Sequence, residues 1–559
     1  MFRYFSRLDL VLDLALLGCL AAACWVPDFG GRTLRAIERI GANLARRKGL
    51  AILAIVLAVP LVRISLLSVS PAPVPAVHDE FSYLLAGDTF AHGRLSNPPH
   101  AMWRFFDTFH VNQQPTYMSK YPPAQGALLA VGQLCGHPWI GVVLSVALMC
   151  GALLWMLQGW MPARWAFLGA VLVFLRLGIF SYWINSYWGG AVPAAGGALV
   201  MGALPRIVRR LRIGDALLLG VGAAILANSR PLEGLLLCLP AAVFLAVQLS
   251  RRGTATGRAV LARVVLPLCA VLFLTGAFLG YYNWRGTGNP LLFPYVLNER
   301  TYMSTPPFAW QSLQAPRHYE NPQMDYFYNQ WAREYWSRMR FAVQWRVAKF
   351  GYFFLWPELC IPFLALPWLL QERKYRFLVW QFLFCFAGMM TIVWFEPHYA
   401  APLTATLFAL VILALRHVRL WKFRGQPAGI GVTRVLVLFA VAMNLVYVGE
   451  ARSNPRASSL VAPAGVWGTP GNWARARIEA QLEALPGQHL AIVRYSPESS
   501  GGEWVYNHAE IDQARVVWAR EIPGVAIEPL LNYFRGRHVW LVEPGASGAR
   551  LSVYPGTHE

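Results

Sequence analysis

The residues best suited to chemistry in this 559-residue chain form one short stretch, His78-Asp79-Glu80-Phe81-Ser82-Tyr83. It follows an apolar run, Leu50–Val69, that is long enough to cross a bilayer. Two adjacent carboxylates at the end of a membrane helix are costly to place, so such groups are usually paired, hydrated or functional. A carboxylate there can take a proton from a hydroxyl group, as a general base does. We therefore take Asp79 as the chemical centre, with Glu80 beside it.

Three further polar groups are expected at the same face of the membrane, each next to an apolar run. They are Lys120 at the end of the first loop, Arg230-Pro231-Leu232-Glu233 at a helix turn, and Glu396-Pro397-His398-Tyr399 at another. Arg and Lys side chains can hold a lipid phosphate, and a divalent ion could bridge a carboxylate and that phosphate through oxygen ligands. These residue types favour a phosphate beside a group that must lose a proton.

Each of these signals also has a structural interpretation. Asp79 and Glu80 could cap a helix that begins there, since acids favour a helix N-terminus, and the two roles are compatible. Arg230 and Glu233 have the spacing of an ion pair on one helix face. His398, in an aromatic turn, is more often a hydrogen-bonded interface residue than a ligand. A functional role is favoured because all of these polar groups are expected on one side of the membrane.

The elements that must position these groups are membrane spans. Apolar residues make up 56% of the chain and charged residues 14%, against roughly 25% charged residues in a soluble domain. The net charge of +21 would suggest nucleic acid if the protein were soluble. Here the Lys and Arg residues lie in short clusters between apolar runs, as in cytoplasmic loops. We therefore expect a polytopic membrane protein without a nucleic-acid partner.

Placing every basic cluster on the cytoplasmic side gives a regular alternation of roughly eleven to twelve spans. The loops 71–121 and 283–347 then lie outside. The run Leu8–Val26 is expected to be retained as a helix, the basic segment Arg32–Lys48 to form an amphipathic helix at the membrane surface, and Phe350–Leu370 to form one span. Polar residues of the second loop are expected to be solvated: Asn298, Glu299, Arg300, His318, Glu320 and Asp325.

Composition divides the chain into three parts. Residues 1–48 hold the N-terminal apolar helix and the basic segment, residues 49–450 the membrane bundle with its two loops, and residues 451–559 a more polar tail. In the tail, Trp473–Leu485 has helical spacing, and short strand-like runs follow it, which predicts a small α/β domain outside the membrane. The chain has no Gly-x-Gly-x-x-Gly or P-loop motif, so nucleotide binding is not expected.

The stretch Asp79-Glu80-Phe81-Ser82-Tyr83-Leu84 is followed by Ala86, Gly93, Pro98 and Lys120-Tyr121-Pro122-Pro123. This pattern resembles the first external loop of the GT-C class of membrane glycosyltransferases, in the branch with the bacterial aminoarabinose transferases of lipid A and the protein O-mannosyltransferase-like enzymes. A weaker match lies at His398-Tyr399-Ala400-Ala401-Pro402, where members of the class often have Arg in place of His398.

The resemblance implies a mainly α, GT-C-like bundle in the plasma (inner) membrane, with membrane lipids around it and an extracytoplasmic α/β domain. It also implies transfer of a hexosyl or pentosyl group from a polyprenyl-phosphate donor to a glycan, lipid or protein acceptor on the outer face. Asp79 would be the general base or the carboxylate that positions the acceptor, and Glu80 its neighbour; the two could ligate Mg²⁺ or Mn²⁺. The implied donor-phosphate ligands are Lys120, Arg230, His398 and Tyr399, and the implied substrate pocket holds Tyr83, Tyr121, Glu233 and Glu396.

A transporter or lipid flippase without covalent chemistry is the alternative. It would explain the spans and the scattered charges. Against it, the sequence has no internal repeat and no pair of broken helices near the membrane centre, and the charges gather at one face. A structural or assembly factor could use the tail to bind a partner, but it would give the acidic first loop no role.

Overall fold

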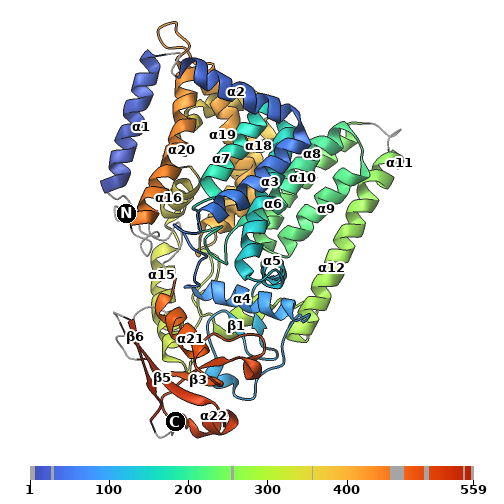
Figure 1. The fold of residues 1–559 in the computed structure, drawn as a ribbon. Coiled ribbons are helices and arrows are strands. Elements are labelled where there is room, and N and C mark those ends of the chain that lie inside the picture. Colours follow the sequence, from blue (N-terminus) through green and yellow to red (C-terminus); the bar gives the residue numbers. More distant parts are fainter. Residues whose placement is uncertain are drawn as a thin grey trace.

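The computed structural model describes residues 7–26, 30–252, 257–355, 357–453, 471–495, 503–545 and 548–555. A bundle of helices makes up most of the molecule, and a smaller domain with a β-sheet is docked at one end of it (Figure 1). We call this end of the bundle the docked end. The expected fold class, a mainly α membrane bundle with a small C-terminal α/β domain, is confirmed.

Seven of the described helices are long and apolar enough to cross a membrane, which makes the chain a multi-pass membrane protein. They are α3 (Lys48–Ser65), α6 (Pro138–Trp160), α8 (Ala191–Arg209), α10 (Pro231–Ser250), the helix Gly257–Thr287 that ends in α12 (Leu266–Thr287), the helix Pro397–Arg419 that ends in α19 (Thr404–Arg419), and α20 (Ala428–Ser453). Shorter apolar helices include α1 (Arg7–Trp25), α9 (Ile213–Ala227) and α18 (Arg376–Met389). Among the described residues, full-length spans thus number seven, against the eleven to twelve expected.

The helix Pro397–Arg419 is the centre of the bundle. In its most apolar window 94% of the residues are buried, against 6% for Gly257–Thr287 at the periphery. Its first turns, η7 (Pro397–Leu403), approach α8 closely at Gly197, where a Cβ atom would lie 2.2 Å from the carbonyl oxygen of Pro402. Small residues permit such close approach of helices within a membrane. This contact fixes the segment that carries His398.

The expected single span Phe350–Leu370 is wrong, because the helix is interrupted. α16 (Val343–Phe354) ends early, and the chain continues as the short helices η6 (Ile361–Ala365) and α17 (Leu366–Gln371). Three prolines, at positions 357, 362 and 367, remove backbone donors from this stretch. The apolar composition of this segment predicted that it lies in the membrane. It could not predict whether the helix is unbroken.

Different helices lie at the two ends of the bundle. At the docked end, α4 (His78–Ala91) packs on α5 (Pro123–Leu134), with Gly126 directly against Ala86. At the opposite end, α2 (Gly31–Arg46) crosses α3 and α7 (Ala163–Leu177), as Figure 1 shows. Glu38 of α2 accepts hydrogen bonds from Arg419 and Arg434, which ties this basic helix to α19 and α20.

The second loop contributes four short helices to the docked end. They are α13 (Pro294–Tyr302), α14 (Pro322–Asp325), η5 (Tyr326–Trp331) and α15 (Ala332–Met339). The C-terminal domain has a four-stranded sheet in the order β4-β3-β5-β6, flanked by α21 (Trp473–Ala484) and α22 (Glu528–Tyr533). The strands are β3 (His489–Val493), β4 (Val516–Arg520), β5 (His538–Gly545) and β6 (Gly548–Val553), the last antiparallel to β5 and not anticipated from the sequence.

Alternate residues of β3 face two different cores. Ala491 and Val493 pack against α21, while Leu490 and Ile492 join a cluster that includes Phe105 of the first loop. Successive side chains of a strand point to opposite faces of the sheet, so one face of this sheet is buried by its own helix and the other by the first loop. The tail predicted to begin at residue 451 thus shares a hydrophobic core with the loop 71–121.

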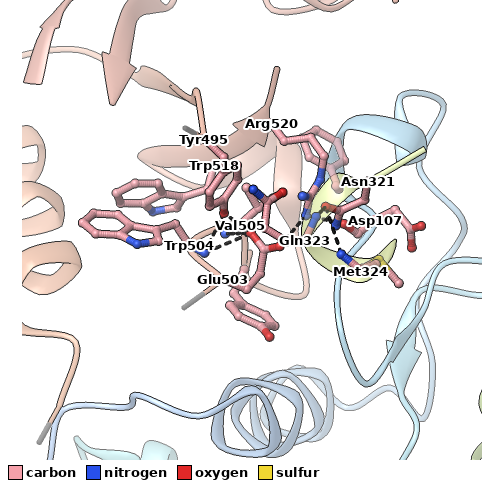
Figure 2. Close-up of polar contacts among 12 residues, drawn as sticks. Asp107, Asn321, Gln323, Met324, Tyr495, Glu503, Trp504, Val505, Trp518 and Arg520 are labelled. Carbon is pink, nitrogen blue, oxygen red and sulfur yellow. Dashed lines mark hydrogen bonds and ion pairs between the residues drawn. The ribbon is translucent and has the colours of Figure 1, made fainter. Parts of the chain in front are cut away.

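A buried ion pair lies at this junction (Figure 2). The Nη2 atom of Arg520 donates to Oε2 of Glu503 at 2.9 Å, and the two side chains are almost fully buried. Arg520 also donates to the carbonyl oxygen of Asp107 in the first loop, and Tyr495 donates to Glu503. The pair therefore connects the C-terminal domain to the loop that carries Asp79.

Candidate active site

Glu80 secures the start of α4. Its Oε2 atom accepts hydrogen bonds from the amides of Ala76 and Val77 at 2.8 and 3.1 Å, and its Oε1 atom accepts from the amide of Tyr187 at 3.1 Å. Burial raises the pKa of Glu80 to about 7, although the three amides favour the ionised form. Glu80 therefore holds the first turn of α4 against the turn 178–190.

Glu80→Gln should lower the melting temperature of the purified protein. Glutamine would place an amide NH₂ group against backbone donors, and an unsatisfied buried donor costs about 1–3 kcal/mol. Thermal unfolding in detergent measures the effect. Glu320→Gln is the matched control, because Glu320 forms an exposed pair with Arg104 and its loss should change little. Equal melting temperatures for Glu80→Gln and the wild type would contradict the role of Glu80 as a clamp.

Asp79 faces a different environment from that of Glu80. Its side chain is 25% exposed, its Oδ1 atom accepts a hydrogen bond from the Tyr121 hydroxyl, and its Oδ2 atom lies 3.9 Å from Nε2 of His110. The ring of Tyr121 stacks on that of Tyr83 at 4.3 Å. In the described part of the chain no Lys or Arg lies within ion-pair distance of Asp79. The carboxylate is thus held by a tyrosine and remains accessible.

Three cations at this end of the bundle are each paired with a carboxylate. The pairs are Lys120 with Glu299 at 3.2 Å, Arg230 with Glu233 at 4.0 Å, and Lys349 with Glu396 at 2.5 Å. They come from the first loop and α13, from the start of α10, and from α16 with the residue before η7. Each positive charge is therefore balanced by a carboxylate, as surroundings of low dielectric constant require.

Tyrosine rings also contact two of these cations. The guanidinium of Arg230 lies 4.2 Å from the ring centre of Tyr399, and the ammonium of Lys120 lies 5.0 Å from Tyr295 and 5.4 Å from Tyr121. Cation–π contacts stabilise such charges where water is scarce, and Lys120 is only 4% exposed. Lys120 and Arg230 are thus each held by a carboxylate and by tyrosine rings.

His398 lies behind this group and is almost fully buried. The amide of His398 donates to the Tyr182 hydroxyl at 3.0 Å, and that hydroxyl lies 2.9 Å from His398 Nδ1. The Tyr182 hydroxyl therefore contacts both the backbone and the ring of His398. Trp188 packs against this ring at 4.8 Å.

The structure separates the residues selected from the sequence into two groups. One cluster contains Asp79, Tyr83, Lys120, Tyr121, Arg230, Glu233, Glu396 and Tyr399. Glu80 and His398 instead bond to Tyr187 and Tyr182 of the turn 178–190.

Sequence reasoning missed four residues of the site. Glu299 was expected to be solvated but pairs with Lys120, and Tyr295 lies one helical turn before it. Lys349 directly precedes an apolar run, which is the signal that selected Lys120 and could have found it. His110 has a left-handed backbone, with φ of 61°, which the sequence does not reveal.

The described residues do not fit the divalent metal that the Asp79-Glu80 pair suggested. Both oxygens of Glu80 are engaged by amides, and the two carboxylates face different surroundings. No group of three or more His, Cys, Asp or Glu residues is placed to hold a metal ion in the ranges given above. We therefore derive no chemical step through a metal.

Comparison with known proteins gives only distant matches. No protein-family model matches the chain, and no curated protein does. It is similar to solved structures of ArnT from Cupriavidus metallidurans, without ligand and bound to undecaprenyl phosphate, at 15% identity over 88% of this chain and 92% of that one, with a TM-score of 0.45. It is also similar to the Archaeoglobus fulgidus oligosaccharyltransferase, at 12% identity over 80% and 62% of the two chains, with a TM-score of 0.38.

Both matched enzymes belong to the GT-C class that the first loop resembles. Identities of 12–15% and TM-scores below 0.5 correspond to a distant similarity in the path of the backbone. Function has to be argued from the side chains around Asp79.

Proposed function

We propose that this protein is a membrane glycosyltransferase that moves a sugar from a polyprenyl-phosphate donor to an acceptor. The observation that carries the proposal is the accessible carboxylate of Asp79 at the end of a membrane bundle. Its hydrogen-bond partner Tyr121 also contacts Lys120, and the paired cations Arg230 and Lys349 lie at the same end. A lipid-linked donor keeps its tail in the bilayer and its phosphate at the interface. The site lies where spans end, so it would meet such a phosphate.

In this proposal the docked end is the extracytoplasmic side of the plasma membrane. The support is the distribution of basic residues. α8 and α19 both start near the site and end away from it with Arg209 and Arg419, and Arg419 pairs with the basic helix α2. Lys and Arg are enriched on the cytoplasmic side of membrane proteins.

The proposed reaction is one displacement at the anomeric carbon of the donor sugar. The acceptor hydroxyl oxygen forms a bond to that carbon, and the bond from the carbon to the phosphate oxygen breaks. Asp79 takes the hydroxyl proton as general base, and polyprenyl phosphate leaves with its additional negative charge. Lys120 and Arg230 would stabilise that charge, which they meet by exchanging Glu299 and Glu233 for the phosphate. The hydrogen bond from Tyr121 orients Asp79 for the transfer.

Lys120→Ala should raise the KM for the donor by about 10–100-fold, with a smaller effect on kcat. The size follows from a hydrogen bond to a charged group, about 1.5–3 kcal/mol. Initial rates at varied concentrations of polyprenyl-phosphate sugar measure both constants. Arg104→Ala removes an exposed cation of the same loop and serves as the control. An unchanged donor KM in Lys120→Ala would argue against contact between Lys120 and the phosphate.

The function itself is tested by incubating the purified protein, in nanodiscs, with a panel of polyprenyl-phosphate hexoses and pentoses and an envelope lipid and glycan extract. The expected result is release of polyprenyl phosphate together with a product heavier by one sugar residue, identified by mass spectrometry. A transporter or flippase would move labelled donor across proteoliposomes without forming a glycosidic bond. That outcome would replace the transferase proposal.

A further inference from the structure

One segment of the C-terminal domain contacts the first loop through most of its own residues. This segment, residues 506–512, is named here the clasp. Its contacts are Tyr506 Oη to His78 Nδ1 at 2.8 Å, Asn507 O to Tyr117 Oη at 2.9 Å, Ala509 N to Asp88 Oδ2 at 2.7 Å, Glu510 to Arg94 at 2.9 Å and Asp512 to His100 at 2.9 Å.

The clasp is held firmly by its own domain. The side chain of Asn507 donates to the carbonyl oxygen of Trp518 in β4 and accepts from its amide, both at 2.8 Å. The carbonyl oxygen of Tyr506 accepts from Arg475 of α21 at 3.0 Å. The backbone that carries Tyr506 is therefore held by the sheet and by α21.

α4 presents different residues to the site and to the clasp. Asp79 and Tyr83, four residues apart, lie on one face and meet at Tyr121. On the other side, the ring of Phe81 is parallel to that of Tyr506, with centres 4.2 Å apart and planes 1° apart. His78 pairs with the hydroxyl of the same tyrosine. The side chain of Tyr506 thus contacts both His78, which precedes Asp79, and Phe81, which follows it by two residues.

We propose that Tyr506 is a positioning residue for the transfer reaction, which places the C-terminal domain inside the catalytic assembly. This inference rests on the function proposed above. Tyr506 does not reach the reacting atoms; it fixes the first turn of α4 so that Asp79 keeps its orientation toward the acceptor. Reaction rates fall steeply when a catalytic group is misplaced by as little as about 1 Å, so support behind the helix is expected to appear in kcat.

The test is Tyr506→Phe, which removes one oxygen atom and keeps the stack on Phe81. We expect kcat to fall about tenfold or more with the donor KM unchanged within about twofold, because the phosphate ligands are untouched. Tyr506→Ala, which also loses the stack, should fall further. Tyr533→Phe is the matched control, since its hydroxyl bonds to Asp512 of the clasp at 3.0 Å without touching α4. It should retain the wild-type kcat.

A double-mutant cycle with His78→Ala separates positioning from a general loss of stability. If Tyr506 acts through His78, Tyr506→Phe should have no additional effect on kcat in the His78→Ala background. Wild-type kcat in Tyr506→Phe, a change in donor KM alone, or full additivity with His78→Ala would each overturn the inference. Failure of the proposed function is distinguishable, because the wild-type protein itself would then transfer no sugar.

Discussion

Asp79→Asn should reduce sugar transfer by about 10²–10⁴-fold, the range in which general bases contribute to catalysis. Asparagine has nearly the same shape and can still accept the Tyr121 hydroxyl hydrogen through its side-chain oxygen. It cannot take a proton from the acceptor. The fold should be unaffected, because Asp79 makes no ion pair with Lys or Arg in the described part of the chain and the clamp of α4 is provided by Glu80.

Release of polyprenyl phosphate, followed by mass spectrometry, measures this effect. Melting temperature and elution from a sizing column establish that the variant is folded. Asp325→Asn, in the second loop, is the matched control, because its carboxylate accepts a hydrogen bond from Asn329 and lies in another helix. An Asp79→Asn protein that transfers sugar within a few-fold of the wild-type rate would remove the proposed catalytic role.

Arg520→Met should destabilise the docked C-terminal domain by about 3–5 kcal/mol, the usual cost of removing one partner of a buried ion pair. Figure 2 shows the reason: Glu503 also accepts from the amides of Trp504 and Val505, and its side chain is fully buried. Without Arg520 its carboxylate would stay buried without a cation. The link to the Asp107 carbonyl oxygen would be lost as well.

Thermal unfolding and the rate of proteolysis within the C-terminal domain measure the loss. Removing both charges in Glu503→Gln/Arg520→Met should restore part of the stability, because replacement of a whole buried pair is often nearly neutral. Arg494→Met is the matched control: its pair with Glu521 is 41% and 27% exposed and contributes at most about 1 kcal/mol. Equal melting temperatures for Arg520→Met and Arg494→Met would contradict the importance of the buried pair.

Local signals in the sequence located the first helix of the C-terminal domain. The expected helix Trp473–Leu485 corresponds to α21 (Trp473–Ala484), because apolar spacing acts within one segment. The strand β6 was not anticipated. It is an edge strand, and all six of its residues are exposed or half-exposed, so its burial pattern lacks the alternation that identifies a strand.

The partners of the site residues could not be predicted in this way. Lys120 and Glu299 are 179 residues apart, and His78 and Tyr506 are 428 residues apart. No local pattern connects such pairs, so Glu299 was assigned to solvent and Tyr506 was not considered. The docking of the sheet on the first loop brings the second pair together, and α13 folding back over Lys120 brings the first.

By itself, the sequence determined that the chain is a multi-pass membrane protein with one acidic stretch at the end of a span, because hydropathy and charge act along a single segment. Only the tertiary structure decided which of the two adjacent carboxylates is accessible and which is held by backbone amides. Neighbouring residues of a helix point about 100° apart, so Asp79 and Glu80 meet different surroundings. Glu80 receives three backbone amides, while Asp79 faces the hydroxyl of Tyr121 and the imidazole of His110.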